Sequence, residues 1–112
     1  MIEGCKTAGP HYNPFNKDHA GPNDKIRHVG DYGNIVMVAG ATEATLIFTS
    51  DLIKLKGKTS VIGRSFVLHA DEDDLGIGGF SDSKTTGHAG ARIACGVIGL
   101  SGPLDHWFWS DI

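Results

Sequence analysis

Apolar and polar residues alternate in short runs along most of the chain. Four runs rich in β-branched residues, separated by glycines, are typical of strands: GNIVMVAG (33–40), ATLIFTS (44–50), SVIGRSFVLHA (60–70) and ARIACGVIGL (91–100). Between them, residues 53–56 alternate Ile, Lys, Leu and Lys, which indicates a strand with one solvated face. No segment shows a helical period. Short strands with Gly-rich turns predict an antiparallel sandwich or barrel.

The segment before these runs has a different character. Residues 1–10 are interpreted as a short tether ending at Pro10. The next stretch, residues 10–31, reads PHYNPFNKDHAGPNDKIRHVGD; its Pro, Gly and Asn residues exclude a helix, and it lacks the alternation of a strand. A loop of this length in a small domain needs something else to order it.

Metal-ligand residues are concentrated in this loop, at His11, His19, His28 and Asp31. Imidazole nitrogens and a carboxylate are ligands that Zn(II) prefers, and a bound metal would order the loop. Any single histidine of this kind is more often a surface residue with no shared role. Four ligand-type residues in one such segment favour a zinc site.

Composition and charge limit the classes of function. A chain of 112 residues forms one domain with a modest core. The net charge of −3 gives no sign of nucleic-acid or acidic-membrane binding, and no run is long and apolar enough to cross a bilayer. The start, MIEGCKT, lacks a signal-peptide pattern, so we expect a cytoplasmic protein. On composition alone, Cys5 and Cys95 are either free thiols or one bridge.

Three long segments resemble the copper/zinc superoxide dismutases: GCKTAGPHYNPFNKDHAGPNDKIRHVGDYGN (4–34), VIGRSFVLHADEDDLGIGG (61–79) and KTTGHAGARIACGVIG (84–99). The resemblance covers nearly all of residues 4–100. It implies an all-β, Greek-key β-barrel or sandwich with a long metal-binding loop. The Gly- and Asp-rich stretch 70–91, on composition a solvated connection, corresponds to the family's electrostatic loop. Copper and zinc are the implied cofactors, and the superoxide anion is the implied substrate.

The resemblance also implies roles for individual residues. His11 corresponds to the histidine that bridges copper and zinc. His69 corresponds to a ligand of copper alone, and Asp73 to the aspartate that links a zinc-ligand histidine to a copper-ligand histidine. Arg92 corresponds to the arginine that attracts superoxide. The remaining implied roles are zinc ligation by His19, His28 and Asp31, and a disulfide between Cys5 and Cys95.

The sequence departs from the family pattern in several places. No strand with a His-x-His copper motif precedes Cys5, so we expect an N-terminally truncated domain over residues 1–100 with an incomplete copper site. Ile77 stands where lysine is common, and His88, which we assign to no metal, where asparagine is usual. The tail 101–112 carries Trp107, Phe108 and Trp109. These cover an exposed apolar face or, as we prefer, reflect read-through in a splice form or incomplete gene model.

Two functions from different classes follow. The first is superoxide dismutation by alternating Cu(II) and Cu(I), impaired in this chain, so its status as an enzyme is left open. The second is a zinc-ordered, disulfide-stapled module without catalysis, which binds itself or a full-length relative through an open sheet edge. A copper-chaperone domain is a third variant, but the sequence has no CxxC motif to support it.

Overall fold

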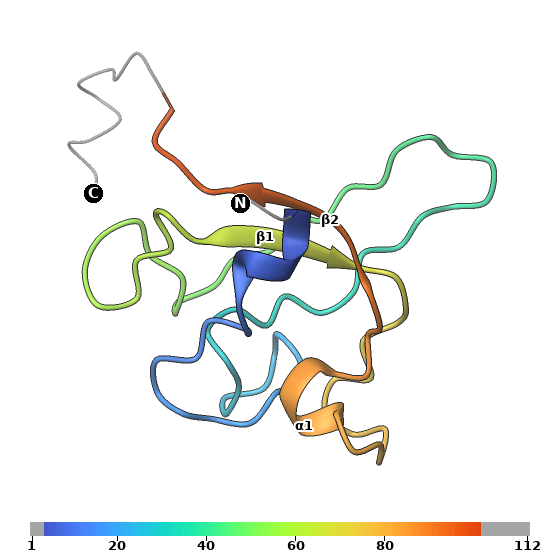
Figure 1. Ribbon diagram of the computed structural model, residues 1–112, viewed down its shortest axis with the longest axis horizontal. Helices are drawn as coiled ribbons and strands as arrows, with labels where there is room; N and C mark the ends of the chain where they lie inside the picture. Colours follow the sequence, from blue (N-terminus) through green and yellow to red (C-terminus); the bar gives the residue numbers. More distant parts are fainter. Residues whose placement is uncertain (1–3, 102–112) are drawn as a thin grey trace.

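The computed structural model describes residues 4–101. Its elements, in chain order, are the 3₁₀ helix η1 (Gly4–Ala8), strand β1 (Ser65–His69), the short helix α1 (Ser83–Thr86) and strand β2 (Arg92–Val97). Long loops make up the rest of the described chain (Figure 1). The aromatic residues of the tail, Trp107 to Trp109, lie outside the described residues. No helix within residues 4–101 is long and apolar enough to cross a membrane.

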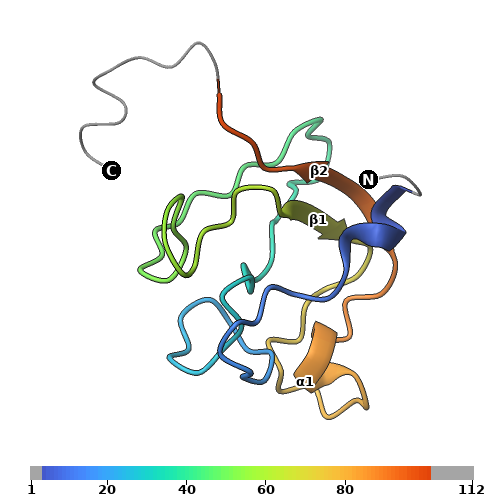
Figure 2. The ribbon, with the colours of Figure 1, turned by 60° about the vertical axis from the view of Figure 1, so that its left-hand side comes forward.

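β1 and β2 form a two-stranded antiparallel sheet. The pairing runs from Ser65 opposite Val97 to His69 opposite Arg92, with an irregularity between Leu68 and His69. This bulge opposes one residue of β1 with two of β2, which changes the direction of the side chains that follow it. Arg92 and Cys95 are therefore the two half-buried residues of β2, although their spacing is odd. Both lie on the face of the sheet that η1 approaches (Figure 2).

The predicted strands are confirmed at two of the expected places and wrong at two others. β1 lies within the run 60–70, and β2 within 91–100. The runs 33–40 and 44–50 form no strand, and residues 53–56 contribute only an isolated bridge between Lys54 and Ser60. A strand needs a neighbour for its N–H and C=O groups. The chain between these two runs projects from the rest of the described residues (Figure 1), and the only backbone hydrogen bond of residues 33–50 among residues 4–101 is a turn from the Ala41 N–H to the Val38 carbonyl.

Two further expectations are corrected. The predicted tether contains the helix η1, which the disulfide at Cys5 attaches to β2. The electrostatic loop contains α1, a single turn that ends at Gly87 in the left-handed conformation. Both elements are too short to produce a helical period in the sequence. A closed barrel is not formed by residues 4–101, whose only named strands are β1 and β2.

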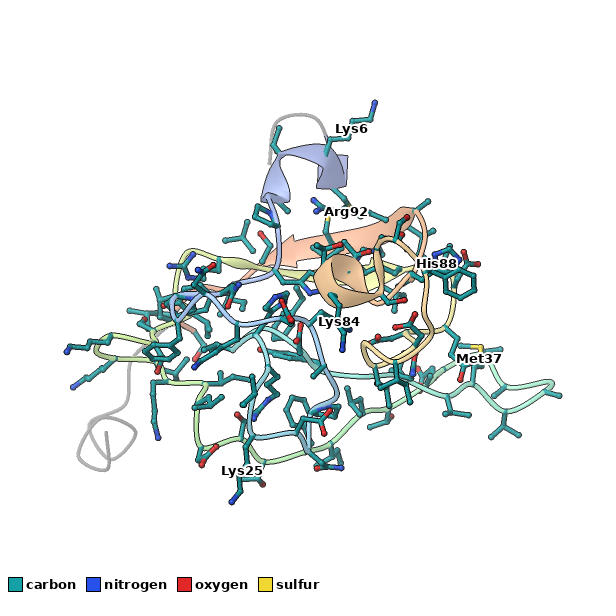
Figure 3. All side chains as sticks on the ribbon, turned by 90° about the horizontal axis from the view of Figure 1, so that it is seen from below. Lys6, Lys25, Met37, Lys84, His88 and Arg92 are labelled. Atoms are coloured by element: carbon teal, nitrogen blue, oxygen red, sulfur yellow. A yellow bond between two sulfur atoms is a disulfide. The ribbon has the colours of Figure 1, made fainter. Side chains whose placement is uncertain are left out.

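The interior of the described chain is polar. Only Val29, Val61 and Ala89 are buried apolar residues, whereas the buried polar residues are His19, Arg27, His28, Asp31, Asp73 and Ser83. Many large apolar side chains are exposed instead, including Phe66 and Leu68 on β1 and Met37 on the projecting segment (Figure 3). Ionisable groups are rarely buried unless they are paired or bind a metal, so the buried cluster indicates the functional site.

Candidate metal centre

The structure brings the four predicted zinc ligands together. One ligand-type atom from each of His11, His19, His28 and Asp31 lies within 4.8 Å of the others, and this is the only such group of metal-ligand residues found among residues 4–101. Nδ1 of each histidine points at the same carboxylate oxygen, Asp31 Oδ1, at 2.9 Å for His11 and His19 and 3.1 Å for His28. Three of the four residues are buried, and His11 is half-buried.

Backbone groups of the loop fix the carboxylate. The N–H groups of Ala20 and His28 donate to Asp31 Oδ2 at 3.0 and 2.9 Å. The other oxygen, Oδ1, is thereby left facing the histidines. A further bond, from the Gly30 N–H to the Tyr12 carbonyl at 3.0 Å, joins the two ends of the loop. Gly30 packs so closely on Tyr12 that a Cβ there would contact the Tyr12 backbone.

This donor set fits a cation. His11 Nδ1 lies 3.3 Å from Nδ1 of both His19 and His28. The three ring nitrogens are therefore crowded around one carboxylate oxygen. Three ring nitrogens directed at one oxygen are more donors than its lone pairs accept with good geometry. Three imidazoles and one carboxylate are a typical donor set for tetrahedral Zn(II). The crowding would be relieved by an ion held between the four groups.

Asp73 fixes the outer side of His19. Its Oδ1 lies 2.7 Å from His19 Nε2, and it accepts the Leu75 N–H at 2.8 Å. Carboxylates in this position set the tautomer and tilt of a ligating imidazole. The Asp73 backbone is held in turn by the Asn34 side-chain amide, which accepts from its N–H at 2.8 Å and donates to its carbonyl at 2.9 Å. The expected link from Asp73 to a copper-side histidine is not found among residues 4–101.

Burial and the two aspartates oppose each other in setting the charge of His19. Burial alone lowers the pKa of His19, but hydrogen bonds to Asp31 and Asp73 outweigh it and raise the pKa from 6.5 to about 9. Burial likewise raises the pKa of Asp31, but hydrogen bonds from His11 and His19 bring it well below its usual range. His28 differs, because burial dominates and lowers its pKa. Without a metal, the cluster holds an ionised carboxylate next to a protonated His19.

The predicted copper side lies beyond His11. The rings of His11 and His69 have centroids 6.0 Å apart, and His69 Nδ1 donates to the Gly90 carbonyl at 3.0 Å. Because Nδ1 of His69 makes this bond, Nε2 is the ring nitrogen that could bind a metal. In His11, Nδ1 is directed at Asp31, so Nε2 is likewise available. Residues 4–101 thus offer two nitrogen donors on this side, where Cu(II) prefers about four. The described residues form only part of a copper site.

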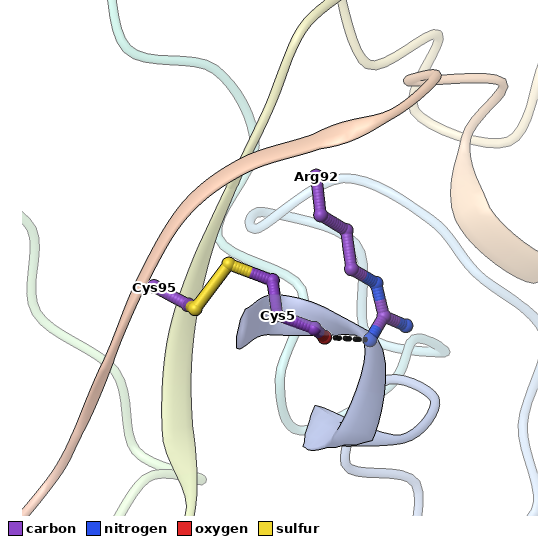
Figure 4. The surroundings of a disulfide bond; sticks show 3 residues. All are labelled: Cys5, Arg92 and Cys95. Atoms are coloured by element: carbon purple, nitrogen blue, oxygen red, sulfur yellow. Dashed lines mark hydrogen bonds between the residues drawn. A yellow bond between two sulfur atoms is a disulfide. The ribbon is translucent and has the colours of Figure 1, made fainter. Parts of the chain in front are cut away.

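Arg92 is held beside His69 by the disulfide region. The structure pairs Cys5 with Cys95, as the resemblance implied, with Cα atoms 5.7 Å apart. The Arg92 guanidinium donates from Nη1 to the Cys5 carbonyl at 2.8 Å (Figure 4). It also donates from Nη2 to the Gly9 carbonyl at 2.6 Å. The helix η1 therefore orients the fork of Arg92, while the sheet register places Arg92 opposite His69.

A cavity of about 530 Å³ connects these groups. Its lining includes His11, His69, Asp73 and Arg92 together with apolar side chains such as Phe66 and Met37. A permanently charged guanidinium beside two imidazoles favours a small anion. Apolar side chains thus form part of the wall around these polar groups.

Two contributors were missed by sequence reasoning. Asn34 follows the zinc loop and has no distinctive motif; its role arises only because Asp73 folds against it. Gly87 packs on Asp73 and His19 so closely that a Cβ would overlap both side chains, and it has φ of 71°. A glycine between Thr86 and His88 was the only available signal for Gly87.

Two residues depart from the family pattern in sequence. His88 lies outside the metal-ligand group and pairs with Asp82, and Ile77 is exposed.

The comparisons with known proteins concern the chain as a whole. Residues 1–98 match the family described as copper/zinc superoxide dismutase (SODC). The chain is 60% identical over 102 residues to the superoxide dismutase [Cu-Zn] of Candida albicans, an alignment covering 88% of this chain and 63% of the relative. It is 57% identical over 98 residues to that of Cryptococcus neoformans, with coverage of 88% and 63%. Against the Candida glabrata protein it is 57% identical over 101 residues, covering 90% and 65%.

The chain therefore belongs to the copper/zinc superoxide dismutase family. Membership brings with it the family's Greek-key β fold, of which residues 4–101 form a small antiparallel sheet and the long loops. The chain spans 63–65% of the length of these relatives.

Proposed function

We propose that this chain takes part in superoxide dismutation as the zinc-binding and anion-binding portion of a copper/zinc centre. His11, His19, His28 and Asp31 would hold zinc, and His11 and His69 would contribute to copper. The observation that carries the proposal is the position of His11. Its Nδ1 lies 2.9 Å from Asp31 in the buried cluster, and its ring lies edge-on to that of His69, the cross-strand partner of Arg92.

Each residue of the proposed site has its own role in the reaction. The guanidinium of Arg92 binds the superoxide anion, and its orientation is set by hydrogen bonds to the carbonyls of Cys5 and Gly9. His11 Nε2, the ring nitrogen not directed at Asp31, is suited to hold a proton and return it to the reduced product. Asp73 keeps His19 in one tautomer. When bound, copper supplies the alternation between two oxidation states, and zinc supplies a fixed tetrahedral centre.

Zinc binding is tested by Asp31→Ala, with Asp18→Ala as the matched control because Asp18 is an exposed carboxylate of the same loop. The protein is refolded with zinc and copper, desalted, and analysed for metal content and melting temperature. We expect about one zinc per chain in the parent and in Asp18→Ala. Asp31→Ala should lose zinc and melt at a lower temperature, because ligand loss couples to folding. Unchanged zinc content and melting in Asp31→Ala would contradict the site.

Anion capture is tested by Arg92→Ala. Superoxide decay is followed by pulse radiolysis at equal copper occupancy, and rates are expressed per bound copper. Removing the charge should lower the second-order rate constant roughly tenfold and flatten its dependence on ionic strength. Lys17→Ala, an exposed cation on the zinc loop, should leave the rate unchanged. An equal rate for Arg92→Ala and the parent would show that Arg92 does not bind the anion.

A second candidate function, a zinc-ordered module without catalysis, is favoured by one observation. Within residues 4–101 the sheet has two strands, and Phe66 and Leu68 on β1 are 54% and 44% exposed. Open edges and exposed apolar faces are sites of association. We propose that this surface pairs with a second copy or with a full-length relative. Retention of zinc without copper, and no superoxide decay above that in buffer alone, would favour this function.

The expected cytoplasmic location and the domain boundary at residue 100 stay predictions.

A further inference from the structure

Three side chains of the electrostatic loop connect the two ends of α1. Asp82, the residue before α1, makes no side-chain cap to the helix; its Oδ1 lies instead 2.7 Å from Nδ1 of His88, beyond the other end. The His88 ring stacks on Phe80, with centroids 3.8 Å apart and planes 8° apart. Figure 3 shows His88 at the edge of the molecule, beside the helix that carries Lys84. We call Phe80, Asp82 and His88 the clasp.

The backbone of His88 is in a conformation that needs such support. Its φ is 53°, in the left-handed region that residues with a Cβ rarely adopt. It directly follows Gly87, which has φ of 71°. Two consecutive left-handed residues turn the chain sharply back along α1. The stack on Phe80 and the bond to Asp82 hold that turn closed.

The helix closed by the clasp lies against the metal cluster. The Lys84 carbonyl accepts the His19 N–H at 2.8 Å, and the Gly87 carbonyl accepts the Asp74 N–H at 2.9 Å. Gly87 also packs directly on the facing side chains of His19 and Asp73. Ser83 connects the two sides, since its hydroxyl donates to Asp74 Oδ2 at 2.5 Å and accepts the Phe80 N–H at 2.9 Å. The backbone of α1 thus covers His19, which is 2% exposed.

A helix of four residues is not stable by itself, because too few hydrogen bonds offset the cost of starting it. The hydroxyls of Thr85 and Thr86 donate to the Asp82 carbonyl, but both bonds lie within the same turn. The clasp adds contacts between residues on either side of the helix. His88 and Asp82 are about half exposed, so the ion pair alone contributes little. The effect of the clasp lies in closing the turn.

We propose that Phe80, Asp82 and His88 are positioning residues for the metal centre, which hold α1 against His19 and Asp73 and so fix the tilt of the His19 imidazole and slow the release of zinc. No residue of the clasp belongs to the cluster of ligand-type residues. The proposal rests on the proposed zinc role of His19. It adds a function for a histidine that the metal site does not use.

The experiment compares zinc release and cobalt spectra of the full chain carrying His88→Ala, Phe80→Ala or His88→Asn. Zinc-loaded protein is mixed with a chromogenic chelator, and the Co(II) form is recorded in the visible range. We expect about tenfold faster zinc release and an altered cobalt spectrum for the two alanine variants. His88→Asn should release zinc more slowly than His88→Ala, because asparagine tolerates the left-handed conformation and keeps a hydrogen-bond donor for Asp82. Phe15→Ala, which removes another half-exposed ring, is the control.

Hydrogen exchange of the metal-free protein gives a readout that does not depend on metal. The His19 amide, bonded to Lys84 of α1, should exchange faster in His88→Ala. The Gly30 amide, bonded to Tyr12 within the zinc loop, should not change and serves as the internal reference. Equal zinc release, cobalt spectra and His19 exchange in parent and clasp variants would overturn the proposal. A parent that binds neither zinc nor cobalt would instead refute the metal site, whereas the exchange result would still test the clasp.

Discussion

At the scale of single residues, the site depends on how one carboxylate and one histidine share protons. Asp31 faces three ring nitrogens, and His19 lies between Asp31 and Asp73. The pKa of His19 is raised to about 9, although burial opposes the shift. A metal ion needs a deprotonated ring nitrogen, so metal binding and protonation of His19 compete.

This competition predicts proton release on zinc binding. At pH 7 the metal-free His19 carries a proton, and zinc should displace close to one proton per chain. Titration calorimetry in buffers of different ionisation enthalpy measures that number. Asp73→Asn should reduce it, because one of the two groups that raise the pKa of His19 loses its charge. Heats that do not depend on the buffer would contradict the prediction.

The same shift gives a pH dependence to the stability of the metal-free chain. A pKa raised from 6.5 to about 9 in the folded state means that the His19 contribution is fully present below pH 6.5 and is lost as the pH rises through 9. The contribution of Asp31, whose folded pKa is lowered, has the opposite sign and is lost in acid.

At the scale of elements, the disulfide makes η1 part of the site. Cys5 and Cys95 are 90 residues apart in the sequence, and the bond between them attaches η1 to β2. The carbonyls of Cys5 and Gly9 then hold Arg92. One covalent connection therefore serves both the stability of the chain and the direction of the Arg92 guanidinium.

Removing this bond should destabilise the chain. Cys95→Ser should lower the free energy of unfolding by about 2–5 kcal/mol, because the disulfide closes a very long loop in the unfolded chain. Urea denaturation measures the change. Thiol titration of the oxidised parent provides the control and should find no free thiol among the described residues. Two reactive thiols in the oxidised parent would contradict the bond.

At the scale of the whole molecule, the described chain buries its polar cluster and exposes its apolar side chains. Its buried apolar residues are Val29, Val61 and Ala89, whereas Phe66 and Leu68 of β1 are exposed. A two-stranded sheet is marginal without further strands or a packed face. The apolar wall of the 530 Å³ cavity is continuous with this exposed surface, since Phe66 and Leu68 belong to both.

This surface predicts association. We expect the chain to self-associate at micromolar concentration, as measured by sedimentation velocity. The double variant Phe66→Thr with Leu68→Thr should weaken association about tenfold or more, since burial of each large side chain contributes roughly 1.5–3 kcal/mol. Ile77→Thr, which removes an exposed apolar residue of the electrostatic loop, should have no effect. A monomeric parent would contradict this role for β1.

The local features of this protein could be predicted from its sequence alone. The apolar runs around Val67 and Cys95 became strands, and the Pro- and Gly-rich loop carried the residue types that a zinc site needs. The runs 33–40 and 44–50 show the limit of such reasoning. Strand propensity is realised only where another strand accepts the hydrogen bonds, and that depends on distant parts of a fold.

Contacts between groups far apart in the sequence depend on the three-dimensional fold. His19 pairs with Asp73 across 54 residues, and Arg92 reaches the Cys5 carbonyl across 87. Local pattern has no information about such contacts, because they depend on chain reversals at turns and on the bulge that aligns His69 with Arg92. The sequence thus determined which residues are chemically capable of binding a metal. The folding of two loops onto one sheet decided which of them face one another.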